Sequence, residues 1–115
     1  MNYWLISDTH FNHSQLEEWG GRSGNWQKQI YKGLSQIPAN DILIHLGDIC
    51  IGNDEEVHHS IFESTAHLTS RILVRGNHDK KSLTWYLNHN WDLVVDGLEL
   101  VFMGRYLHLT HRPGS

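Results

Sequence analysis

Carboxylate, imidazole and amide side chains follow three short apolar runs of the sequence. Asp8 and His10 follow the first run, Asp48 follows the second, and Asn77 and His78 follow the third. Such oxygen and nitrogen ligands suit Mn, Fe, Zn or Ni. Two ions about 3.5–4 Å apart can activate a water and neutralise a phosphate ester under attack. The three groups therefore predict a metal-dependent site for phosphoester hydrolysis.

The spacing within the groups suits metal ligands. Asp8 and His10 lie two residues apart, so in an extended loop their side chains share one side and can bind one ion. The two oxygens of Asp48 can bridge both ions. Asn77 offers a neutral carbonyl oxygen, and Gly76 before it permits a tight exit from the strand. Simple loop capping is the alternative for each residue alone, and it is disfavoured for the set.

Three residues in or beside these groups have other predicted roles. His78 lies beside Asn77, and its predicted role is to contact the phosphoryl oxygens or to protonate the departing alkoxide. Arg75 could attract an anionic substrate or only keep the surface hydrated, and the second interpretation is favoured. Cys50 is predicted to be a small buried residue rather than a nucleophile, because the sequence places no base beside it.

The elements that must position these residues alternate between strand and helix up to about residue 90. Strands are predicted at 3–7, 41–46 and 71–75, helices at 25–37, 53–68 and 80–88, and further strands at 93–96, 98–103 and 106–111. This alternation predicts an α/β fold with a largely parallel sheet and helices on its faces. Ligands of such sheets bind beyond the carboxyl ends of the strands, where all three groups would meet.

Several side chains have a predicted environment. The first strand is apolar throughout and is predicted to be buried, and His45 is predicted to be a core histidine with a hydrogen-bond partner. Asn53 lies three residues before a glutamate and resembles the start of a capping box. His58 is predicted on the exposed face of the second helix, and Leu83 and Leu87 are predicted to point inward from the third.

Length and composition predict one domain over residues 1–115. Hydrophobic residues make up 39% and charged residues 19%, as in ordinary globular proteins. No apolar run is long enough to cross a bilayer, the N-terminus lacks the basic start of a signal peptide, and there is a single cysteine. A cytoplasmic protein that does not interact with membranes is therefore expected.

The charge is divided unevenly along the chain. Residues 1–70 carry 3 Lys/Arg and 9 Asp/Glu, whereas residues 71–115 carry 6 and 4. An acidic first part argues against a general nucleic-acid-binding surface, which needs a basic patch. Nucleic acid is therefore expected as a substrate only, if it is bound at all.

Three segments resemble the motifs of the calcineurin-like metallophosphoesterase family. They are SDTHFNH at 7–13, HLGD at 45–48 and LVRGNHD at 73–79, and they look closest to the small bacterial and phage members. The resemblance extends from Ile6 to about Pro113. It implies a shortened αββα sandwich whose first sheet is mainly parallel. It also implies two divalent ions, with Mn favoured, and a phosphate-ester substrate.

The resemblance also assigns roles to residues. It implies Asp8 and His10 on one metal, Asp48 as the bridging ligand, Asn77 on the other metal, and His78 as the residue that contacts the transition state. Asn77 and His78 would then also contact the substrate.

Two further histidines gain a role from the same resemblance. A later histidine of the family ends a strand, often just before a proline, and His111-Arg112-Pro113 matches this pattern. His111 is therefore favoured as a metal ligand over His108, whose side chain would point to the opposite face of the strand. His13 fits the local pattern of a substrate contact, although a lone histidine in a polar loop is more often solvated.

The sequence departs from the family at one motif. The 115 residues contain no Gly-His-x-His after His111, a motif that in the family supplies one histidine to each metal. Hydrolysis of a phosphomonoester or phosphodiester by metal-activated water is the expected function. The alternatives are a non-catalytic metal-binding or regulatory relative, and a truncated fragment without activity. A homo-oligomer could complete the site or cover an exposed sheet edge.

Overall fold

A four-stranded parallel sheet forms the centre of the protein. The computed structural model describes residues 2–7, 9, 11, 25–50, 52–76, 79–102 and 105–110, with the backbone alone for 100–102 and 105–107. The strands, in their order across the sheet, are β1 (Tyr3–Ile6), β2 (Ile42–His45), β3 (Ser70–Val74) and β4 (Leu93–Val95). The predicted parallel sheet is therefore confirmed.

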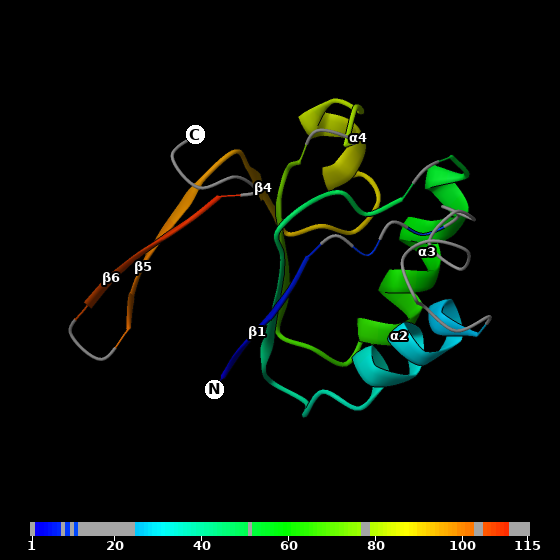
Figure 1. Cartoon of the computed structure of the whole chain (residues 1–115), viewed down its shortest axis with the longest axis horizontal. Coiled ribbons are helices and arrows are strands. Elements are labelled where there is room, and N and C mark those ends of the chain that lie inside the picture. The colour runs from blue at the N-terminus through cyan, green and yellow to red at the C-terminus, as the bar shows by residue number, and fades with distance from the viewer. Residues whose placement is uncertain are drawn as a thin grey trace.

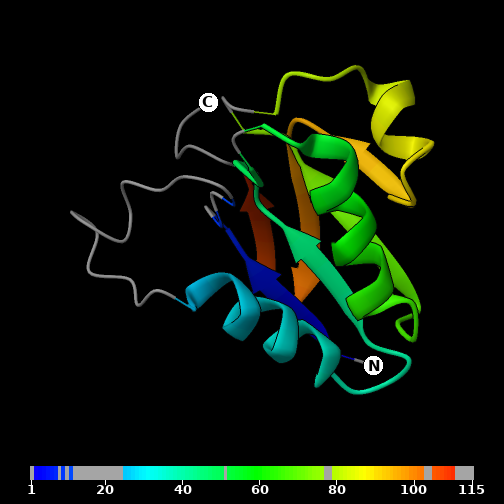
Figure 2. The same cartoon turned by 90° about the vertical axis from the view of Figure 1, so that its right-hand side faces the viewer.

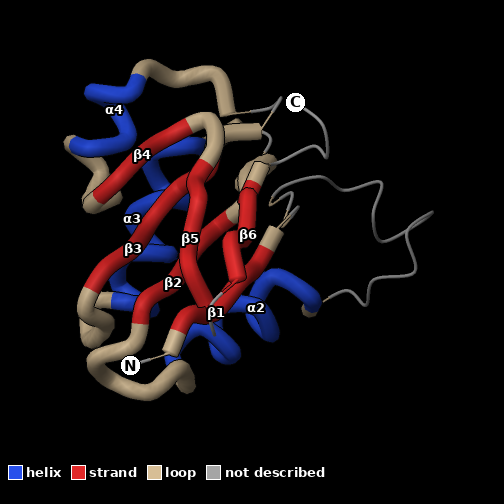
Figure 3. Tube along the Cα trace, turned by 90° about the vertical axis from the view of Figure 1, so that its left-hand side faces the viewer, coloured by secondary structure: helices blue, strands red, loops and turns tan. Residues whose placement is uncertain are grey.

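Helices and a hairpin lie on opposite faces of this sheet. Helices α2 (Trp26–Ser35) and α3 (Asp54–Thr65) cover one face, as Figures 1 and 2 show, and the short α4 (Leu83–Leu87) connects β3 to β4. Strands β5 (Leu98–Phe102) and β6 (Arg105–Leu109) form an antiparallel hairpin on the other face (Figure 3). This α/β arrangement agrees with a shortened αββα sandwich. None of the described helices is long and apolar enough to cross a membrane.

The register of the sheet aligns the carboxyl ends of the first three strands. Ile6 lies beside His45 in the β1–β2 pair, and His45 lies beside Leu73 in the β2–β3 pair. All of these pairs are parallel. The chain therefore leaves β1, β2 and β3 at one edge of the sheet, and the loops that carry the three motifs begin side by side.

The main core lies between the sheet and the helices. Phe11, which lies within the first motif, is fully buried and stacks on Tyr31 of α2 with ring centroids 4.7 Å apart. Trp26 stacks on the Phe11 ring as well, with the centroids 5.9 Å apart. The core also contains the two residues after Asp48, namely Ile49 and Cys50. The predicted burial of Cys50 is confirmed. The first two motif loops thus lead directly into packed apolar side chains.

The prediction that the first strand is buried is wrong. Tyr3, Trp4 and Leu5 are 44%, 43% and 53% exposed. The reason is the position of β1 at one end of the strand order, where no described strand pairs with its outer edge. An apolar run has the same sequence signature in an edge strand and in a central strand, so the pattern alone could not distinguish them.

The inward placement of Leu83 and Leu87 is also wrong, because both side chains are exposed. Helix α4 contains five residues and buries Tyr86 instead, which is 0% exposed. The Tyr86 hydroxyl accepts a hydrogen bond from the backbone N–H of Lys81 at 3.1 Å. The side-chain oxygen of Ser82 caps the helix by accepting from the N–H of Trp85.

Helix α3 differs from the prediction at two residues. Asn53 has a left-handed backbone, with φ 51°, and its side chain makes no capping hydrogen bond. Because a capping residue normally has an extended backbone, the predicted capping box is wrong. Three acidic residues in the first turn, at 54–56, lie at the positive end of the helix instead. His58 is buried, with 1% exposure, where the sequence predicted an exposed side chain.

Candidate functional site

The residues that frame the predicted site are described more fully than the predicted ligands themselves. Among the predicted residues the structure describes Asp48 and Arg75. The others lie outside the described residues, so their roles stay predictions: Asp8, His10, His13, Asn77, His78 and His111. The geometry of the site is therefore built from Asp48 and from the neighbours that hold the three loops.

The second and third loops approach each other at Gly47. This glycine has φ 102°, a left-handed conformation that suits glycine. A Cβ atom at position 47 would lie 2.5 Å from the backbone nitrogen of Gly76 and 2.8 Å from the carbonyl oxygen of Val74. The next residue, Asp48, also has a positive φ, of 55°. The two backbones are therefore in direct contact beside Asp48, and any side chain at position 47 would separate them.

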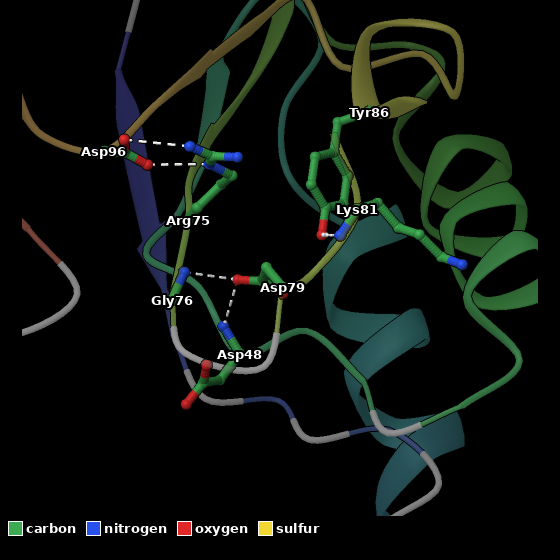
Figure 4. Close-up of polar contacts among 7 residues, drawn as sticks. All are labelled: Asp48, Arg75, Gly76, Asp79, Lys81, Tyr86 and Asp96. Atoms are coloured by element: carbon green, nitrogen blue, oxygen red, sulfur yellow. Dashed lines mark hydrogen bonds and ion pairs between the residues drawn. The ribbon is translucent and has the colours of Figure 1, made fainter. Parts of the chain in front are cut away.

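Asp79 bridges the same two loops with its carboxylate (Figure 4). Its Oδ2 accepts hydrogen bonds from the N–H groups of Asp48 and Gly76, both at 2.7 Å, and its Oδ1 accepts from the N–H of Ile49 at 3.1 Å. Figure 4 shows the Asp48 carboxylate pointing away from Asp79. Asp79 thus binds the backbone N–H of Asp48, while the Asp48 side chain points away from Asp79.

Asp79 is buried, with 8% exposure. Burial raises the pKa of its carboxyl group, while the three backbone N–H groups act in the opposite direction. The nearby carboxylate of Asp48 raises it further. A buried charge is costly unless it is well paired, and three backbone N–H groups pair with the Asp79 carboxylate. These hydrogen bonds therefore stabilise the local structure.

A second set of hydrogen bonds ties the first loop to the second. The N–H of Gly47 donates to Nδ1 of His45 at 3.0 Å, so in the neutral ring the hydrogen is on Nε2. That nitrogen lies 3.0 Å from Oγ1 of Thr9, whose hydroxyl donates to the carbonyl oxygen of Ile49 at 2.8 Å. Thr9 stands between Asp8 and His10 in the sequence, so it joins the first motif to the second.

His45 is buried, with 2% exposure, and the predicted core histidine with a hydrogen-bond partner is confirmed. Its structural role extends beyond the core, because it joins two motif loops. The sequence prediction assigned no role to Thr9 or Asp79, although both lie within the motifs. Their residue types could have indicated this role, because a hydroxyl or a carboxylate at a strand end can bind backbone groups that the sheet leaves unpaired.

The guanidinium group of Arg75 is paired with Asp96. Nε and Nη2 of Arg75 donate to the two carboxylate oxygens at 2.9 and 3.1 Å, as Figure 4 shows. The hydrogen bonds to Arg75 lower the pKa of Asp96. Asp96 is largely exposed, so the pair contributes little to stability. It does tie the end of β3 to the turn between β4 and β5. Contact of Arg75 with substrate stays a prediction.

A different group of side chains could in principle hold a metal ion. Cys50, Asp54 and His58 each offer a ligand atom, and these atoms lie within 4.8 Å of one another. However, Nε1 of Trp91 donates to Nδ1 of His58 at 2.8 Å. Neutral His58 therefore carries its hydrogen on Nε2 and has no further lone pair for a metal.

In the chain without a metal ion, the thiol of this group is protonated. Burial, followed by the nearby Asp54 carboxylate, raises the pKa of Cys50 to about 12. The thiol is then protonated at neutral pH, whereas a metal binds the thiolate. Without a metal ion, Cys50 and His58 are buried side chains, and His58 is hydrogen-bonded to Trp91.

A family model and a solved structure are similar to this chain. A family model described as calcineurin-like phosphoesterase matches residues 1–112. A crystal structure of a protein of unknown function from Aquifex aeolicus is similar over the whole chain, with a TM-score of 0.79 and 28% sequence identity. The chain spans 63% of the length of that protein. No curated protein matches the sequence.

Proposed function

Since the chain belongs to the calcineurin-like phosphoesterase family, we propose that it hydrolyses a phosphomonoester or phosphodiester. The observation that carries this proposal is the match over residues 1–112, which includes all three motifs. The carboxyl ends of β1, β2 and β3, which come before or within these motifs, lie at one edge of the sheet. Divalent metal ions are general cofactors of such sites. We propose two ions per chain, with Mn favoured among Mn, Fe, Zn and Ni.

The donor chemistry of the proposed ligands fits such ions. Asp8 and His10 would bind one ion, Asp48 would bridge both and Asn77 would bind the other ion, with His111 as a further metal ligand. When bound, the pair of ions would supply Lewis acidity and an activated water. This ligand set combines carboxylate, imidazole and amide groups, which suit borderline divalent cations.

The residues of the chain itself would orient the ester and handle protons. The N–H groups of Asp48 and Ile49 are bound to Asp79, so the backbone of the second loop is fixed while the Asp48 carboxylate points away. His78 would contact the phosphoryl oxygens and donate a proton to the departing alkoxide. Asn77 would contact the same oxygens. His13 and Arg75 are weaker candidates, since Arg75 already pairs with Asp96.

Hydrolysis of two chromogenic esters by the purified 115-residue chain tests the proposal. With Mn²⁺, the protein should hydrolyse p-nitrophenyl phosphate or bis-p-nitrophenyl phosphate. Asp48→Asn should lower kcat because it weakens the proposed bridging ligand. His78→Ala should lower kcat by at least about 100-fold, because general acid catalysis alone contributes this much. His59→Ala is the control, since His59 is an exposed residue on α3 whose partner is Glu63.

Two results would contradict the proposed roles. Variants with wild-type turnover would remove Asp48 and His78 from the mechanism. Metal binding without turnover of either ester would favour the alternative, a non-catalytic metal-binding or regulatory relative.

A further inference from the structure

We infer that Asp79 is a positioning residue that fixes the loop of Asp48 relative to the loop of Asn77 and thereby sets the geometry of the metal site. The inference rests on the proposed function, because it concerns the same site. Asp79 itself would not touch the metal ions or the substrate. It would act through the backbone of the residues that do.

The geometry that supports this role is the convergence of two chain segments on one carboxylate. Two successive N–H groups, of Asp48 and Ile49, bind the two oxygens of Asp79, and the N–H of Gly76 shares Oδ2. All three donors are backbone groups, so the bonds fix the path of the chain. Hydrogen bonds to an ionised acceptor are short and roughly twice as strong as neutral ones, in keeping with the two distances of 2.7 Å.

Gly76 and Asp79, within the third motif, are joined by two hydrogen bonds. The N–H of Gly76 donates to the side chain of Asp79, and the N–H of Asp79 donates to the carbonyl oxygen of Gly76 at 3.3 Å. Asn77 and His78 are the two residues between these anchors in the sequence. The span that contains a proposed ligand and the proposed acid is therefore held at each end, and the same carboxylate also holds Asp48.

Among the described residues, the backbone N–H groups of Asp48 and Ile49 donate to Asp79. Strand β2 ends at His45, so the N–H groups of Asp48 and Ile49 lie beyond the ladder, and each is bonded to Asp79. Gly47 brings the two backbones together without a side chain to hold them there. Asp79 is buried, so water cannot readily take over its hydrogen bonds. Its carboxylate is consequently the group best placed to set the distance between the loops.

Asp79→Asn tests this role with almost no change in side-chain volume. The amide keeps one acceptor oxygen, but its NH₂ group would face a backbone N–H, so at least one of the three hydrogen bonds is lost. Loss of a group that orients metal ligands typically costs about 10–100-fold in metal affinity or activity. We expect a weaker Mn²⁺ affinity and a lower kcat, each by about 10–100-fold, with KM changed far less.

The matched control is Asp92→Asn. Asp92 also accepts a hydrogen bond from a backbone N–H, that of Arg71 at 2.9 Å, but it lies at the opposite end of β3. This variant should retain the Mn²⁺ affinity and kcat of the wild type. Thermal unfolding of both variants checks that each one is folded at the assay temperature.

Three measurements on the full chain decide the matter: Mn²⁺ titration, steady-state kinetics, and the ¹H–¹⁵N NMR signals of Asp48, Ile49 and Gly76. In Asp79→Asn these amide protons should shift upfield and exchange faster with solvent, while metal affinity and kcat fall. Unmoved amide signals would overturn the inference. So would moved signals with unchanged metal affinity and kcat, because Asp79 would then be structural only.

Failure of the inference can be distinguished from failure of the proposed function. A wild-type protein that is active with Mn²⁺, beside an equally active Asp79→Asn, removes the positioning role and leaves the function intact. A wild-type protein that binds no Mn²⁺ and hydrolyses neither ester overturns both, whatever the amide signals show.

Discussion

Two buried histidines are each held in one tautomer by a neighbouring N–H group. Nδ1 of His45 accepts from the backbone of Gly47, and Nδ1 of His58 accepts from the indole of Trp91. Both rings are nearly inaccessible to solvent. The same residue type thus has two functions in this protein, since His45 connects motif loops whereas His58 packs among Trp85, Tyr86 and Trp91.

The environment of His58 predicts a loss of stability in acid. Burial lowers the pKa of His58 to about 4, below its ordinary value of 6.5. Between these values the unfolded chain binds a proton that the folded chain does not, so the free energy of unfolding falls as the pH drops. From pH 7 to pH 5 this residue should remove about 2 kcal/mol.

Urea denaturation at the two pH values measures this effect. In His58→Gln the pH dependence should be smaller than in the wild type by the amount given above, whatever the stability of the variant at pH 7. His59→Gln, which changes the exposed neighbour on the same helix, should keep the wild-type pH dependence. An equal pH dependence in His58→Gln and the wild type would contradict the assignment.

The order of strands and helices was predictable because each element has a clear apolar pattern and each motif begins where an apolar run stops. The environment of several elements was not. The burial of β1 depends on its place in the strand order, and the burial of His58 depends on Trp91, which lies 33 residues away in the sequence. Such long-range neighbours leave no periodic signal. The short helix α4 likewise has too few residues for a reliable apolar face.

The contact between the β2 and β3 loops makes a prediction for Gly47→Ala. The new Cβ would have a positive φ and would lie 2.5 Å from a backbone nitrogen that cannot move without moving the third motif. A left-handed non-glycine residue costs about 1–2 kcal/mol, and overpacking adds about 1–3 kcal/mol. We expect the free energy of unfolding to fall by about 2–5 kcal/mol, measured by urea denaturation.

Gly33→Ala is the control for this substitution. Gly33 lies in α2, and a Cβ there would meet nothing within 4 Å. Alanine is the better helix former by about 0.5–1 kcal/mol, so this variant should be slightly more stable than the wild type. A small effect of Gly47→Ala, similar to that of Gly33→Ala, would show that the two loops can separate without cost.

At the scale of the whole molecule, one edge of the parallel sheet gathers the loops that follow β1, β2 and β3. Thr9, His45 and Asp79 join these loops through buried hydrogen bonds. The sequence predicted which loops would meet, because parallel strands bring their carboxyl ends to one edge. It did not predict the bonds between them, since a hydroxyl or carboxylate in a loop can find its partner in any neighbouring segment.

Removal and return of the metal ions tests the central claim most directly. The protein is treated with a chelator, dialysed, and titrated with Mn²⁺ while bound metal and hydrolysis of bis-p-nitrophenyl phosphate are measured together. The account predicts that turnover disappears after chelation and recovers as two Mn²⁺ ions bind per chain. Turnover that survives chelation, or a chain that binds no Mn²⁺, would contradict it.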